Sequence, residues 1–147
     1  MKNFDSKYFA DFKFSPEQIK KNLDNALKDL NIAKQDEILD VKFNYIYTAL
    51  IKSGIALLSS YGIKVRSVIG HHRKVIEKLA ELLKDESVID ISNVMRAKRN
   101  LDLYAGGVEV TEKECREYIQ FAENVLSEVV KFIKKKFQSK TDKSIHS

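Results

Sequence analysis

The feature that most constrains the fold is a periodic apolar stripe near the C-terminal end of the chain. Its members recur in steps of three and four residues: Cys115, Ile119, Ala122, Leu126, Val129, Ile133 and Phe137. Residues spaced in this way lie on one face of an α-helix, and that face must be buried against other elements. Thr111 precedes the stripe and Glu114 follows Thr111 by three residues, which is the pattern of a capping box. The sequence therefore predicts a long amphipathic helix that opens at Thr111.

Helix-breaking residues are scarce in the rest of the chain as well. The 147 residues include only five glycines and one proline, a composition typical of long helices joined by short turns. No alternating strand pattern of useful length is visible. Ser15 and Gln18 form a second capping-box pattern around Pro16, which suits the first position of a helix. Four further helices are predicted, over residues 16–33, 36–61, 71–85 and 87–105.

The segment 36–61 is apolar around most of its circumference. Such a helix is either central to a bundle or shared with a partner chain. Ser53, Gly54 and Ala56 are small enough to let another helix approach closely, and Gly62 suits the C-terminal cap. Because a bundle of this size buries about one wide stripe per helix, we predict that a symmetric homodimer covers the surplus apolar surface.

These elements predict one all-α domain, an antiparallel up-and-down bundle of four to five helices. A chain of 147 residues is long enough for one domain with a substantial core. We expect that domain to span 1–147, with a core over about 15–138 and a basic tail over 139–147. Gly106 and Gly107 are expected to end the fourth helix. The lysines of the tail either complement a helix dipole in solvent or contact a nucleic acid.

Charge and cysteine content narrow the class of protein. The net charge of +5 permits an anionic partner without requiring one. No apolar run is long enough for a transmembrane helix, and the first residues lack the apolar centre of a secretory signal. The single cysteine, Cys115, excludes an internal disulfide framework, and its place on the apolar stripe predicts a packing residue instead of a nucleophile. We expect a cytoplasmic protein that does not contact a membrane.

Several common catalytic motifs are missing. The sequence has no glycine-rich phosphate loop, no dinucleotide fingerprint and no serine-elbow motif. It also lacks the Glu-x-x-His motifs of carboxylate-bridged metal centres. His71 and His72 are adjacent, and neighbours on a helix point about 100° apart, so these two do not form a chelating pair. We therefore expect neither a metal ion nor a cofactor.

The segment MRAKRNLDLYAGG, residues 95–107, concentrates cationic and polar side chains. Arg96, Asn100 and Tyr104 are four residues apart and share a helical face, with Arg99 beside them and Lys98 nearby. Guanidinium groups bind phosphate oxygens through paired hydrogen bonds, and a tyrosine can stack on a base or donate to a phosphate. The cluster therefore predicts a phosphate-binding site. The alternative is structural: the arginines pair with carboxylates of a neighbouring helix, and the tyrosine closes the core.

Three segments together resemble the HEPN superfamily, in the branch that carries an Arg-Asn-x-x-x-Tyr motif. They are FNYIYTALIKSGIALLSSYGIKVRSVIGHHRKVIEKL, MRAKRNLDLYAGG and TEKECREYIQFAENVLSEVVKFI, and the resemblance covers roughly Phe43 to Phe132. It implies a helical bundle that is usually dimeric, with the motif near a cleft at the dimer interface. Many members are metal-independent ribonucleases. They act as toxins of toxin–antitoxin pairs, often beside a small nucleotidyltransferase, or in phage defence and RNA processing.

The family's catalytic pattern is an arginine, four to six further residues and then a histidine. Arg99 and Asn100 match its arginine and polar positions, but Tyr104 stands at the histidine position. A histidine suits proton transfer because its pKa is about 6.5, whereas a tyrosine, with a pKa of about 10, is a poor base. The resemblance thus leaves room for a histidine from the third helix. The candidate catalytic residues are Arg99, Asn100, Tyr104, His71 and His72, and the candidate RNA-binding residues are Arg96 and Lys98.

Three interpretations of the chain remain open. The first is a metal-independent endoribonuclease of a toxin–antitoxin or phage-defence system. The second is a catalytically silent HEPN protein that binds RNA or a nucleotide, or that pairs with a nucleotidyltransferase-type antitoxin. The third is a helical protein whose arginines are structural. Cleavage of RNA without added metal separates the first from the second.

Overall fold

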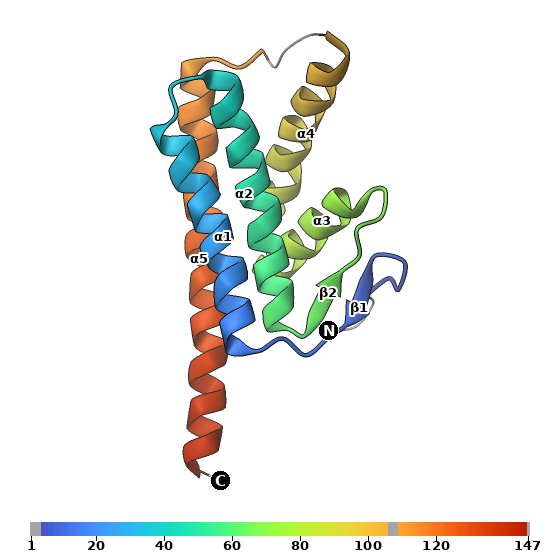
Figure 1. Ribbon diagram of the computed structural model, residues 1–147, viewed down its shortest axis with the longest axis vertical. Coiled ribbons are helices and arrows are strands. Elements are labelled where there is room, and N and C mark those ends of the chain that lie inside the picture. Colours follow the sequence, from blue (N-terminus) through green and yellow to red (C-terminus); the bar gives the residue numbers. More distant parts are fainter. Residues whose placement is uncertain (1–3, 106–108, 147) are drawn as a thin grey trace.

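The computed structural model describes residues 4–105 and 109–146, with side chains described over 4–100 and 109–138. Within these ranges the chain forms five helices and a small two-stranded sheet (Figure 1). The helices are α1 (Pro16–Gln35), α2 (Leu39–Ser60), α3 (His71–Leu83), α4 (Ser87–Ala105) and α5 (Glu112–His146). The predicted all-α antiparallel bundle is confirmed, and the helices lie close to their predicted ranges. Gly106 and Gly107, the expected end of the fourth helix, lie outside the described residues.

Both predicted capping boxes are present. Before α1, the Ser15 hydroxyl accepts from the Gln18 amide at 3.1 Å, and the Gln18 side chain accepts from the Ser15 amide at 2.8 Å. Thr111 and Glu114 make the same exchange before α5, with both bonds at 3.0 Å. These bonds satisfy amides that the first turn of a helix leaves without intrahelical partners. Gly62 follows α2 with φ at +75°, a left-handed conformation that favours glycine, as the sequence predicts.

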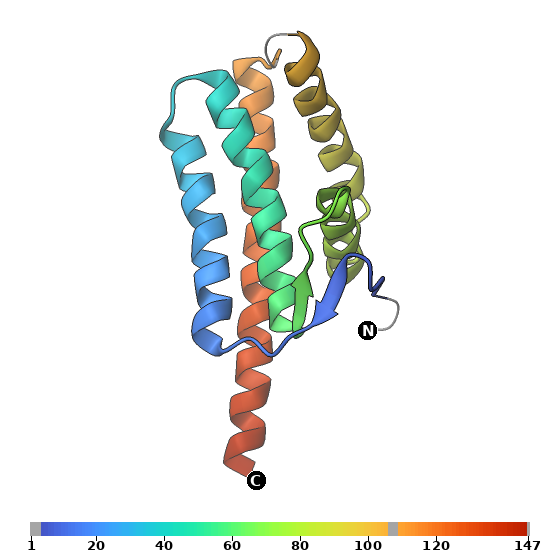
Figure 2. The same cartoon turned by 45° about the vertical axis from the view of Figure 1, so that its right-hand side comes forward.

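Helix α2 runs through the centre of the bundle. It packs against α1, α5, α3 and α4, and against strand β2 (Ile63–Val65). In Figure 2, α1 lies on one side of α2, and α3 and α4 lie on the other. Gly54 allows the close approach of α3, because a Cβ at this position would lie 2.5 Å from the Val75 Cγ1 atom. A larger side chain there would force the two helices apart.

Neighbouring elements of the same chain therefore cover the apolar circumference of α2. Its buried residues include Phe43, Ile46, Leu50 and Leu57, all with no exposed surface. The surplus apolar surface that predicted a homodimer is thus buried without a second chain. The apolar circumference of α2 is therefore no longer a reason to expect a homodimer, and the homodimer stays a prediction.

A short sheet connects the N-terminal segment to the segment before α3. Strand β1 (Phe9–Asp11) pairs antiparallel with β2, with Phe9 opposite Val65. The pairing continues past the sheet, where the Arg66 amide donates to the Tyr8 carbonyl at 2.7 Å. The sequence did not reveal these strands because three residues are too few to show an alternating pattern. The sheet places the N-terminal segment beside the chain that leads into α3.

Helix α5 is longer than its apolar stripe. The backbone stays helical to His146, so the basic segment 139–146 continues this helix. In Figure 1 the last turns of α5 extend past the lower end of the bundle. Among the described residues, no helix has both the length and the apolarity needed to cross a membrane.

Candidate functional site

A cavity of about 420 Å³ opens between the start of α3 and the middle of α4. Helix α4 contributes Arg96, Arg99 and Asn100 to its wall, and α3 contributes His71 and His72. The structure thus brings five of the seven predicted site residues around one space, which we call the α3–α4 cavity. Segments about 25 residues apart in sequence meet here because α3 and α4 pack on each other as an antiparallel pair.

The two cavity arginines that come from α4 have no carboxylate partner among the described residues. Among the described residues, neither Arg96 nor Arg99 forms an ion pair. The Arg96 Nε atom is buried and has no hydrogen-bond partner in the same part of the chain. Buried N–H groups are normally satisfied, so an unpaired guanidinium N–H beside a cavity is a feature of a site for an anion. The structural alternative, in which the arginines pair with carboxylates of a neighbouring helix, therefore finds no support here.

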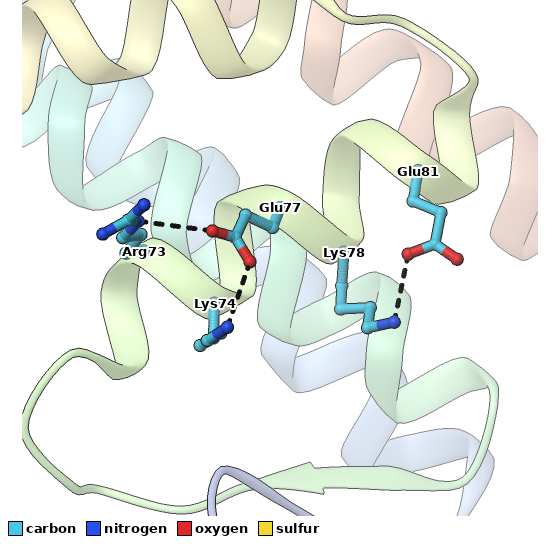
Figure 3. A network of polar contacts seen from close by, with 5 residues as sticks. All are labelled: Arg73, Lys74, Glu77, Lys78 and Glu81. Atoms are coloured by element: carbon cyan, nitrogen blue, oxygen red, sulfur yellow. Dashed lines mark hydrogen bonds and ion pairs between the residues drawn. The ribbon is translucent and has the colours of Figure 1, made fainter. Parts of the chain in front are cut away.

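The cations on the outer face of α3 form ion pairs instead. Arg73 pairs with Glu77 at 3.3 Å, Lys74 pairs with the same carboxylate at 3.4 Å, and Lys78 pairs with Glu81 at 3.0 Å (Figure 3). Arg73 also lines the α3–α4 cavity, but its guanidinium is engaged by Glu77. Among the described residues, the cavity cations that lack a carboxylate partner are therefore those of α4.

The start of α3 adds to the positive potential of the cavity. Gly70 caps the helix with φ at +86°, no side chain caps it, and its first turn holds no acidic residue. The amides at a helix N-terminus carry partial positive charge and lack intrahelical partners, so they favour a nearby anion. Gly70, His71 and His72 all line the cavity, which places this end of α3 at its wall.

The histidines lie against each other and are held in defined orientations. Their ring centroids are 4.3 Å apart. The His71 Nδ1 atom lies 2.8 Å from the Val68 carbonyl oxygen. A carbonyl only accepts, so Nδ1 carries the hydrogen of this bond and Nε2 is left to exchange a proton with a ligand. Burial, followed by the neighbouring His71 and Arg99, lowers the pKa of His72 below its ordinary 6.5. A lowered pKa favours the neutral imidazole, which is the form that can accept a proton.

Tyr47 of α2 also forms part of the cavity wall, although the sequence shows it only as one residue of the mostly apolar segment 36–61. It is 2% exposed. The Arg99 guanidinium carbon lies 5.1 Å from the centroid of its ring, and the His72 ring centroid lies at 6.0 Å. Burial raises the pKa of the Tyr47 phenol, although Arg99, Arg96 and a hydrogen bond from Arg99 act in the opposite direction. A signal for this residue exists in the sequence, because a buried tyrosine hydroxyl in an apolar helix needs a polar partner.

Of the two remaining predicted site residues, one lies away from the cavity and the other has a side chain that the structure does not describe. The Lys98 amine pairs with the Glu114 carboxylate at 3.1 Å and donates to the Glu109 carbonyl at 3.3 Å. It therefore ties α4 to the start of α5 and is absent from the cavity wall. The sequence could not separate Lys98 from Arg99, since both belong to one basic run. The side chain of Tyr104 lies outside the described residues.

Cys115 is buried, as its place on the apolar stripe predicts. Its side chain has no exposed surface, and its Sγ atom lies 3.8 Å from the Leu39 carbonyl oxygen. Burial is the main cause that raises the pKa of the thiol. A thiol with a raised pKa is a weak nucleophile at neutral pH, because the reactive form is the thiolate.

The described residues contain no cluster of three or more His, Cys, Asp or Glu side chains that could hold a metal ion. Comparisons of the chain with protein-family models, with curated proteins and with solved structures find no match. No relative therefore assigns a role to the cavity residues, and their chemistry has to be inferred from their geometry.

Proposed function

We propose that this chain acts on RNA as a metal-independent endoribonuclease of a toxin–antitoxin or phage-defence system. The observation that supports the proposal is the meeting of Arg96, Arg99 and Asn100 with His71 and His72 around one cavity. The guanidinium groups lack carboxylate partners among the described residues and suit a phosphodiester. The resemblance of the sequence to the HEPN superfamily supplies the expectation that this phosphodiester belongs to RNA.

In this proposal the ribose 2′-hydroxyl attacks the adjacent phosphorus. His72, whose lowered pKa favours its neutral form, accepts the hydroxyl proton as the new oxygen–phosphorus bond forms. Arg99 stabilises the negative charge that develops on the phosphorane oxygens. The bond to the 5′-oxygen then breaks, and His71 or the Tyr104 phenol supplies a proton to the leaving oxygen. Asn100 positions the ribose or a base edge through its amide.

The alternative is a catalytically silent HEPN protein that binds RNA or a nucleotide, or pairs with a nucleotidyltransferase-type antitoxin. The observation that favours it is Tyr104, which stands where the family pattern has a histidine. Binding needs only the cations of the cavity, whereas cleavage needs a base and an acid placed at the same phosphate. The two functions therefore share Arg99 and differ in their need for a histidine.

The test compares the wild type with Arg99→Ala in two assays. The purified chains are incubated with RNA in the presence of EDTA, and each chain is also induced in cells while growth and RNA integrity are followed. We expect the wild type to cleave RNA and slow growth, and Arg99→Ala to do neither. Arg116→Ala is the matched control, because Arg116 is an exposed arginine on α5 that is absent from the cavity wall.

Three further variants assign the proton transfers. If a histidine is the base, its alanine variant abolishes cleavage, and Tyr104→Phe only slows it. If the Tyr104 phenol donates the proton, Tyr104→Phe lowers the rate while the fold survives. RNA that binds the wild type but is never cut, with binding lost in Arg99→Ala, would favour the silent alternative. Equal binding and equal growth for all chains would contradict both functions.

A further inference from the structure

We propose that Tyr47 is a positioning residue of the α3–α4 cavity, whose buried ring holds the Arg99 guanidinium in place for a phosphate. The inference rests on the proposed function, because Arg99 is the group assigned to the phosphorane. Tyr47 belongs to α2 and lies 52 positions before Arg99, so no sequence motif connects the two residues.

The first argument is the need of Arg99 for support. An arginine side chain has many rotamers, and fixing it costs conformational entropy that a partner must offset. Among the described residues no carboxylate supplies that partner, but the Tyr47 ring lies under the guanidinium at 5.1 Å. A cation over a ring uses the face of the guanidinium and leaves N–H groups in its plane for a phosphate. A carboxylate in the same place would occupy those N–H groups and cancel the charge.

The second argument is the rigidity of Tyr47 itself. Its side chain is 2% exposed and sits midway along α2, the helix that packs against all the others. Phe43 and Leu50, about one turn away on the same face of α2, are fully buried, so the Tyr47 ring is fixed by close packing. Because Tyr47 is fixed in the bundle core, its ring restricts the movement of the long, flexible Arg99 side chain at the cavity.

The third argument is that one ring contacts both sides of the cavity. Arg99 comes from α4, and His72, whose ring centroid lies 6.0 Å from that of Tyr47, comes from α3. The same ring thus helps to set the spacing between the arginine and the proposed base.

The test compares Tyr47→Met with Tyr47→Phe in the full chain. Methionine keeps much of the buried volume but removes the ring, whereas phenylalanine keeps the ring that supports Arg99. Tyr61→Met is the matched control, because the Tyr61 ring also carries a cation, Lys136 at 3.1 Å, but is absent from the cavity wall. We expect the kcat for RNA cleavage to fall about tenfold or more in Tyr47→Met, with a smaller change in KM. Tyr47→Phe and Tyr61→Met should stay within a few-fold of the wild type.

A second readout by NMR does not depend on activity. The groups that face His72 are Tyr47 on α2, His71 on α3 and Arg99 on α4. Without the ring, Arg99 moves away and water enters, so the pKa of His72 should rise toward 6.5 in Tyr47→Met and stay low in Tyr47→Phe. An unchanged His72 titration in a folded Tyr47→Met variant would overturn the proposal.

A third readout uses the wild type and so remains decisive if Tyr47→Met does not fold. The Arg99 Cδ protons should be shifted upfield by the ring current of Tyr47, and Tyr47→Phe should preserve the shift. Resonances at random-coil positions in the folded wild type would overturn the positioning role. Should the wild type show the ring-current shift but cut no RNA, the nuclease proposal fails while the role of Tyr47 toward Arg99 stands.

Discussion

The bundle has two parts that are built on different principles. In the first, formed by α1, α2 and α5, apolar stripes meet along continuous interfaces, with residues such as Leu30, Leu50 and Leu126 almost completely buried. In the second, formed by α3 and α4, the buried Ser92 Oγ and Arg96 Nε atoms have no hydrogen-bond partners among the described residues, whereas the buried Asp29 carboxylate of α1 is paired with Lys52 at 2.7 Å. Buried polar groups without a partner cost stability, because they lose water and gain no hydrogen bond.

This difference means that the residues that contribute most to stability and the residues of the candidate site lie mostly in different parts of the bundle. Helix α4 makes less extensive contact with α3 and α2 than α1 and α5 make with α2, although its Val88 and Met95 side chains are buried in the same core. The α3–α4 part can therefore carry unpaired cations and a cavity while the other part keeps the chain folded. Substitutions in the two parts should separate accordingly into effects on stability and effects on activity.

The largest expected effect is a loss of stability caused by a substitution in the α1–α2–α5 part. Leu50 has no exposed surface, so Leu50→Ala should lower the free energy of unfolding by about 2–5 kcal/mol through lost burial and a residual cavity. Urea unfolding followed by circular dichroism measures this change. Leu27→Ala is the control: Leu27 is 40% exposed, and its loss should cost about 0.5 kcal/mol. Similar costs for the two variants would show that α2 is not the centre of stability.

The next effect belongs to the site. Arg99→Ala should remove about 3 kcal/mol of transition-state stabilisation, or on the order of a hundredfold in cleavage rate, with little change in unfolding free energy. Arg99→Lys should restore little, since a point charge does not replace a planar guanidinium. Rates measured under single-turnover conditions check both variants. An Arg99→Ala chain that unfolds as readily as Leu50→Ala would mean that the two parts are not separable.

A smaller effect is expected at the junction between the parts. Gly54→Ala places a Cβ against Val75 and should cost about 1–3 kcal/mol, despite the better helix propensity of alanine. Val75→Ala in the same chain should relieve the clash, so the double variant should be more stable than the sum of the single costs predicts. Denaturant unfolding of all four chains measures the coupling. If the stability costs of the two substitutions simply add, α3 does not pack closely against Gly54.

A substitution of Cys115 tests the α1–α2–α5 part and changes no residue of the α3–α4 part. Its buried thiol fills space at the start of α5, so Cys115→Ala should cost about 1 kcal/mol of stability. RNA binding and cleavage should stay at the level of the wild type. Activity lost from a folded Cys115→Ala chain would give the thiol a chemical role that its burial argues against.

The smallest effect is the pH dependence from His72. Its pKa is lowered in the folded state, so the unfolded chain binds the proton more tightly than the folded chain does. The corresponding stability is fully present above about pH 6.5 and is lost as the pH falls toward the folded pKa. Unfolding free energies at pH 7.5 and 5.5 should therefore differ more for the wild type than for His72→Gln. Equal differences for the two chains would contradict the lowered pKa.

The sequence by itself determined those features that depend on neighbours within a few turns of chain. The helices and both capping boxes follow from apolar periodicity and from residues three apart, and these interactions form inside one segment. The same local spacing places Arg96 and Asn100 on one face of α4. The expected membership of the HEPN superfamily and the homodimer belong to a different category, because neither the fold nor the comparisons tests them.

Tertiary structure alone decided which of these residues meet. Lys98 and Arg99 are neighbours in one basic run, yet Lys98 pairs with Glu114 while Arg99 rests on Tyr47. The outcome depends on the rotation of α4 against its neighbours and on the distance between α2 and α3, which the contact of Gly54 with Val75 sets. The β1–β2 pairing is likewise made between distant segments. Such contacts depend on the packing of the whole bundle, and the spacing of residues within one segment does not predict them.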